Sequence, residues 1–98
     1  MSNEEIEAGK NWVEKMLSQH AQDLGLTIRG LEWGWGAGDF DNNRLTLSFS
    51  VDTKRCIEKF SVDDLADVPN TRSVQVELNN LLKKLVESSL EQSKKTGF

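Results

Sequence analysis

The chain is poor in the residues that build disulfides, metal sites and membrane spans. Its 98 residues include one cysteine, one histidine, one proline and no tyrosine. A single cysteine excludes an intramolecular disulfide, and no apolar run approaches the ~20 residues that a membrane-spanning helix needs. The start of the chain, from Met1 to Glu7, is acidic, whereas a secretory signal is basic and then apolar. These features predict a cytoplasmic protein without a membrane segment.

The charge pattern argues against generic nucleic-acid binding. The net charge is −4, and acidic residues are concentrated in residues 1–25 and 62–70. A protein that binds phosphates usually gathers Lys and Arg on one surface, and only residues 71–98 carry a weak basic excess. The length and the 37% of hydrophobic residues fit one globular domain. We expect this domain to span residues 1–93, with residues 94–98 as a frayed tail.

Apolar residues at helical spacing predict two long helices. The first spans about residues 3–24, and Gly25 is placed to end it in the left-handed conformation. The second spans about Arg72 to Gln92, with apolar side chains over roughly half of its circumference. A short helix over residues 62–67, capped by Ser61, is expected before it.

Three strands are predicted between the helices. Residues 44–51 alternate between apolar and polar without exception, which indicates a half-buried antiparallel strand. Residues 55–60 follow a short turn and are charged enough for an edge strand. The first strand runs from Leu26 to about Trp35 and changes phase near Gly30. A β-bulge at Gly30 would keep the apolar side chains inside and Glu32 outside, and we favour it because burying an unpaired carboxylate is costly.

The predicted order is α-β-β-β-(short α)-α, which indicates a single small α+β domain. Its simplest form is a three-stranded antiparallel meander with the two long helices packed on one face. The other face, with Thr46, Ser48 and Ser50, is then open to water or to a partner. Double-stranded RNA-binding domains share this order of elements, but the similarity is one of topology only. Their second helix begins with a lysine cluster, whereas residues 71–74 here are Thr-Arg-Ser-Val.

Two apparent ligand motifs fail on inspection. Residues 34–39 lack the third glycine of a dinucleotide fingerprint and the Gly-Lys-Ser/Thr of a Walker loop. Asp39, Asp41 and Asn43 have the opening spacing of a calcium loop, but Arg44 stands where the loop needs glycine and Ser50 where it needs glutamate. We therefore predict no metal site and no cofactor.

No catalytic residues are predicted either. His20 lies on the apolar stripe of the first helix, where we expect a core or boundary residue with one satisfied nitrogen. Cys56 lies in a predicted strand, and we expect a buried, inert thiol. Because no acid–base pair or activated nucleophile is visible, the chain is not expected to be an enzyme.

Residues 31–40 are the segment that fold-building explains least, since they hold two of the three tryptophans and three of the seven glycines. Tryptophan combines a large apolar face with one N–H donor, which suits it to anchoring a partner. Either both tryptophans pack under the helices, or at least one is exposed near the loop and anchors another protein. The leading hypothesis is a non-enzymatic protein–protein interaction domain, either homodimeric or acting as an adaptor or chaperone.

The candidate residues follow from these two interpretations. For partner binding they are Trp33, Trp35, Phe40, Val86 and Leu90. Val86 and Leu90 are included because they extend the apolar arc of the last helix beyond what three short strands need to cover. The alternative is a binding module for a small or anionic ligand, in which Arg29, Lys54 and Arg55 flank the Trp/Gly-rich segment.

Overall fold

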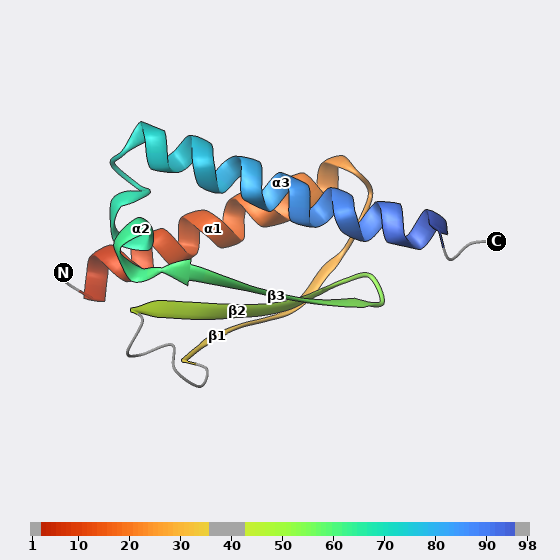
Figure 1. Ribbon diagram of the computed structural model, residues 1–98, viewed down its shortest axis with the longest axis horizontal. Helices are drawn as coiled ribbons and strands as arrows, with labels where there is room; N and C mark the ends of the chain where they lie inside the picture. The colour runs from red at the N-terminus through yellow and green to blue at the C-terminus, as the bar shows by residue number, and fades with distance from the viewer. Residues whose placement is uncertain (1–2, 36–42, 96–98) are drawn as a thin grey trace.

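The chain folds into two layers, a sheet and a set of helices on one of its faces (Figure 1). The computed structural model describes residues 3–35 and 43–95, with side chains described up to Ser89. The order of elements is the predicted one. Helix α1 spans Asn3–Asp23, strands β1, β2 and β3 span Ile28–Gly34, Arg44–Val51 and Lys54–Ser61, and helices α2 and α3 span Val62–Asp67 and Arg72–Lys95.

The sheet is an antiparallel meander in the order β1-β2-β3, so β1 and β3 form its edges. The pairing of β1 with β2 shifts between Arg29 and Glu32, and Gly30 has a φ of +65° there. Glycine adopts this conformation readily because it lacks a Cβ atom. The predicted bulge is thereby confirmed. It lets Ile28 and Trp33, on either side of it, share the face on which the core lies.

The core lies between the sheet and the helices. Strand β2 supplies its centre, with no inward side chain more than 4% exposed: Leu45, Leu47, Phe49 and Val51. The helices cover this layer with apolar side chains at helical spacing: Val13, Leu17 and Ala21 from α1, and Leu78, Leu82 and Val86 from α3. Two further side chains from α2 close one end: Val62 and Leu65. The strict alternation of β2 therefore leaves its other face outside the core.

Helices α1 and α2 touch at Gly9, which is buried. A Cβ atom at this position would overlap the backbone carbonyl of Leu65. Only glycine allows the two backbones to approach so closely. Gly9 therefore fixes how α2 docks on α1, although no sequence pattern had singled it out.

The helix ends agree with the predictions in part. Gly25 has a φ of +71° after α1, which confirms the left-handed end. Ser61 occupies the N-cap position of α2, but its side chain makes no capping hydrogen bond. Helix α3 continues three residues beyond Gln92 to Lys95, so part of the predicted tail is helical, and residues 96–98 lie outside the described residues. Over residues 3–35 and 43–95, no helix is long and apolar enough to cross a membrane.

Candidate functional site

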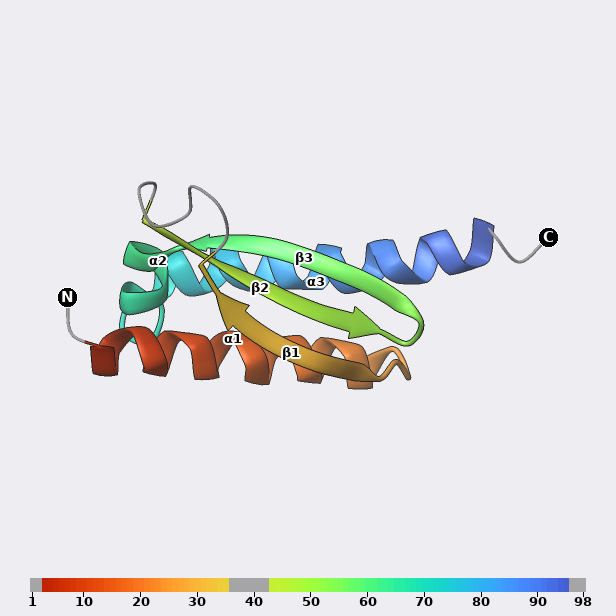
Figure 2. The ribbon, with the colours of Figure 1, turned by 90° about the horizontal axis from the view of Figure 1, so that it is seen from below.

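The sheet face that points away from the helices has no described element over it (Figure 2). We call it the open face. Its residues alternate with the core residues along the three strands: Arg29, Glu32, Gly34, Arg44, Thr46, Ser48, Ser50, Arg55, Ile57 and Lys59. Cross-strand pairing orders them in rows, and the central row is Glu32, Ser48 and Ile57.

The two tryptophans of the Trp/Gly-rich segment lie in different environments. Trp33 pairs with Leu47 and packs partly buried against the core. Its ring lies 5.7 Å from that of Phe60, and Lys10 Nζ lies 6.0 Å from the ring centroid. Trp35 follows the last residue of β1 and is 50% exposed. The two tryptophans therefore do not both pack under the helices, and the anchoring of a partner by Trp35 stays a prediction.

Trp33 serves the fold through its apolar ring and not through its N–H group. Its Nε1 atom is buried and has no hydrogen-bond partner among the described residues. Leaving a buried donor unsatisfied costs about 1–3 kcal/mol. Ring burial against Phe60 must outweigh that cost. Trp33 is therefore a core residue, whereas Trp35 is half exposed.

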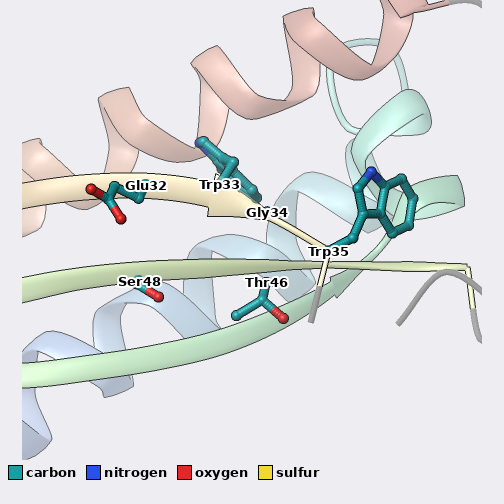
Figure 3. Close-up of a pocket in the computed structure, with 6 residues that line it drawn as sticks. All are labelled: Glu32, Trp33, Gly34, Trp35, Thr46 and Ser48. Atoms are coloured by element: carbon teal, nitrogen blue, oxygen red, sulfur yellow. The ribbon is translucent and has the colours of Figure 1, made fainter. Parts of the chain in front are cut away.

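A shallow hollow lies on the sheet beside Trp35 (Figure 3). It is lined by Glu32, Trp33, Gly34, Trp35, Thr46 and Ser48. Apart from its chain neighbours Trp33 and Trp35, no described residue has an atom within 4 Å of where a Cβ atom of Gly34 would stand. The volume is about 230 Å³, below the ~300–1,000 Å³ of typical small-molecule pockets. The hollow therefore suits one large side chain better than a cofactor.

Two basic residues meet elsewhere on the open face. Arg29 and Arg55 both pair with Ser50, from opposite sides of β2. Arg55 Nη1 donates a hydrogen bond of 3.5 Å to Ser50 Oγ, and it lies 3.5 Å from where a Cβ atom of Gly30 would stand. The Arg55 side chain therefore reaches across β2 to the bulge. Lys54 instead pairs with Val51, on the core side.

The basic residues do not flank the exposed tryptophan as predicted. Trp35 follows Gly34, which pairs with Thr46, whereas the arginine pair stands at Ser50. Four residues of β2 separate the two rows, a distance of ~13 Å at ~3.3 Å per residue. The reversal of the chain between β1 and β2 puts them at opposite ends of the same face. Their separation could be calculated only once the register was known.

The other candidate partner residues do not contribute to this face. Val86 is 0% exposed, so its side chain is not available to a second molecule. The prediction for Val86 was wrong because α3 packs on α1 as well as on the sheet, and this larger contact buries Val86. Phe40 and the side chain of Leu90 lie outside the described residues.

His20 and Cys56 have structural surroundings. His20 Nε2 lies 2.7 Å from Asn79 Oδ1 in a partly buried contact, which confirms a boundary residue with one satisfied nitrogen. Cys56 is partly and not fully buried, and its Sγ atom lies 3.4 Å from Ser89 Oγ. Among the described residues, no three His, Cys, Asp or Glu side chains are grouped to hold a metal ion.

Sequence reasoning missed Ile57, which is 62% exposed on the open face. It pairs with Ser48, one of the residues that line the hollow. The signal was present in the alternation of β3. Cys56 and Phe60 share the core phase, so Ile57 had to point outward, between the charged residues Arg55 and Lys59.

Comparisons of the chain with protein-family models, with curated proteins and with solved structures found no match. The open face and its edge at the end of β1 carry the features that bear on a function. These are an exposed tryptophan beside a hollow, an exposed isoleucine in the central row, and an arginine pair at the far end.

Proposed function

We propose that this domain binds another protein through the open face of its sheet and does so without catalysis. The observation that carries the proposal is Trp35, which is half exposed beside a hollow that fits one side chain. Tryptophans next to such hollows are frequent anchors of protein interfaces. Ile57 supplies a second apolar contact within the same three strands.

The size of the open face supports a modest interface. Three strands spaced ~4.8 Å apart and about eight residues long cover ~380 Å². A standard protein–protein interface buries ~800 Å² on each partner. The face therefore matches a short segment or a transient contact better than an extensive, permanent interface.

The strongest test compares two β-branched residues that are almost equally exposed on different surfaces. Ile57 is 62% exposed on the open face, and Val76 is 52% exposed on α3. Wild-type protein, Ile57→Ser, Val76→Ser and Trp35→Ala are immobilised and used to capture partners from the native cell. Captured proteins are quantified by mass spectrometry.

We expect the specific partners to be retained by wild type and Val76→Ser and to be depleted about tenfold by Trp35→Ala, a loss of ~1.4 kcal/mol. Ile57→Ser should deplete the same proteins. Circular dichroism of each variant confirms that the fold is intact. If Val76→Ser alone depletes them, the partner binds the helical surface and the proposal is wrong.

A further inference from the structure

The open face is basic on a chain whose net charge is −4. Its strands present four basic side chains, Arg29, Arg44, Arg55 and Lys59, and one acidic side chain, Glu32. Among the described residues, no carboxylate forms an ion pair with Arg29 or Arg55. Arg55 thus contacts Ser50, and Arg29 stands opposite the same serine on β1, without a counter-charge on either arginine. An incoming carboxylate would stabilise this arrangement.

Building on the function proposed above, we propose that the partner presents an extended acidic segment to the open face. One bulky apolar side chain of the segment occupies the hollow beside Trp35 and contacts Ile57. A carboxylate of the same segment lies between Arg29 and Arg55, above Ser50. Charge complementarity with the basic face and the small area of the face both favour such a segment over a large rigid surface.

The register of the sheet sets the spacing of the two groups. The hollow reaches the row of Thr46, and the arginine pair stands in the row of Ser50. An extended peptide advances ~3.3 Å per residue, as β2 itself does. Because the hollow also reaches the row of Ser48, where Ile57 lies, a segment that runs along β2 carries its apolar and acidic residues about two to four positions apart. Peptides that bind in the proposed way must show this spacing between their apolar and acidic residues.

Two other occupants fit the open face less well. A second copy docked through the same face would oppose two basic surfaces, and like charges facing each other weaken association. A single-stranded nucleic acid needs bases stacked on aromatic rings along its path. Strands β2 and β3 place no aromatic residue on the open face.

The test selects random displayed peptides of about 12 residues on immobilised wild-type protein, a length that covers the whole of β2. The same selection is run on three variants: Arg29→Ala/Arg55→Ala, Trp35→Ala, and Lys83→Ala/Lys84→Ala. The last is the matched control, since it removes the same charge from exposed positions on α3. Selected peptides are then synthesised, and their Kd is measured by fluorescence polarisation.

We expect wild type to enrich peptides with a bulky apolar residue and an acidic residue about two to four positions apart. The Arg29→Ala/Arg55→Ala variant should bind them at least ~10-fold more weakly, with a smaller dependence on salt. The Lys83→Ala/Lys84→Ala control should bind within about twofold of wild type. Replacing the acidic residue by glutamine in the peptide should weaken binding to wild type but not to the arginine variant.

The outcomes separate this inference from the function on which it rests. Peptides that need Trp35 but show no acidic enrichment would overturn the acidic segment and leave the binding function standing. Peptides that bind the Trp35→Ala variant as well as wild type would overturn both. Tighter, arginine-dependent binding of an oligothymidylate, or an arginine-dependent dimer in light scattering, would show that the occupant belongs to another class.

Discussion

The two faces of the sheet are made by alternate residues of the same strands, yet they have almost nothing in common. In β2 the inward residues are four large apolar side chains, and the outward ones are an arginine and three hydroxyl residues. The inner face is covered by α1, α2 and α3, while no described element covers the outer face (Figures 1 and 2). Burial of apolar surface is the main source of folding free energy, so stability comes from the inner face.

This difference leaves the outer face free to serve binding. An exposed strand position can hold almost any residue with an effect of about 0.5 kcal/mol or less on stability. The fold thus does not require the exposed isoleucine, the exposed tryptophan or the cluster of basic groups. If the comparison holds, substitutions on the inner face should change stability, and those on the outer face should change binding alone.

The largest contrast is expected between neighbouring residues of β2. Phe49 is fully buried, and Ser50 lies on the open face. Phe49→Ala should lower the free energy of unfolding by ~3–5 kcal/mol because it leaves a cavity in the core. Ser50→Ala should change it by no more than ~0.5 kcal/mol. Urea denaturation of both variants measures the two values, and similar values would contradict the division between the faces.

The tryptophans provide the second contrast. Trp33→Ala should cost ~2–4 kcal/mol, somewhat less than a fully buried aromatic residue, because its ring is only partly buried and its N–H group is unsatisfied. Trp35→Ala should cost less than ~1 kcal/mol in stability. Denaturant melts of both variants, combined with the peptide-binding assay, give the comparison. Equal and large destabilisation by both would show that the whole segment is core.

Much of this architecture was predictable because it depends on local patterns. The alternation of residues 44–51 and the phase change at Gly30 contain the information for β2 and for the bulge, since each concerns nearby residues. The same patterns located His20 on a partly buried helix face. Local physical rules of this kind do not require knowledge of which elements meet in space.

The errors concern contacts between distant segments. Val86 was predicted to contact a partner because the contact between α3 and α1, which buries it, is not visible in the sequence of α3 alone. The distance between Trp35 and the arginine pair depends on the register between strands. The exposure of Trp35 follows from the end of β1 at Gly34, where pairing with β2 no longer directs the side chain. Long-range geometry therefore set the limit of sequence reasoning.

Two glycines give the third contrast. Gly9→Ala should destabilise the domain by ~1–3 kcal/mol through overlap with the Leu65 backbone, even though alanine favours helices by ~1 kcal/mol. At Gly34 no described residue beyond its two chain neighbours has an atom within 4 Å of an added Cβ atom, so Gly34→Ala should stabilise the domain by ~0.5 kcal/mol. Thermal melts followed by circular dichroism measure both. A stabilised Gly9→Ala variant would show that α1 and α2 are not in close contact there.

The smallest contrast lies within β3, between adjacent residues on opposite faces. Cys56 is partly buried beside Ser89, and Ile57 is the exposed residue of the central row. Cys56→Ser should cost about 1 kcal/mol or less, because the new hydroxyl can keep the contact with Ser89 Oγ, and it should leave peptide binding unchanged.

Ile57→Thr keeps a β-branched residue suited to a strand, so stability should change by less than ~0.5 kcal/mol. Binding should nevertheless weaken severalfold, because Ile57 contacts the partner in the proposed complex. Chemical denaturation and fluorescence polarisation of the two variants decide the matter. If Cys56→Ser weakened binding and Ile57→Thr did not, the partner would be recognised through the helical side of the molecule.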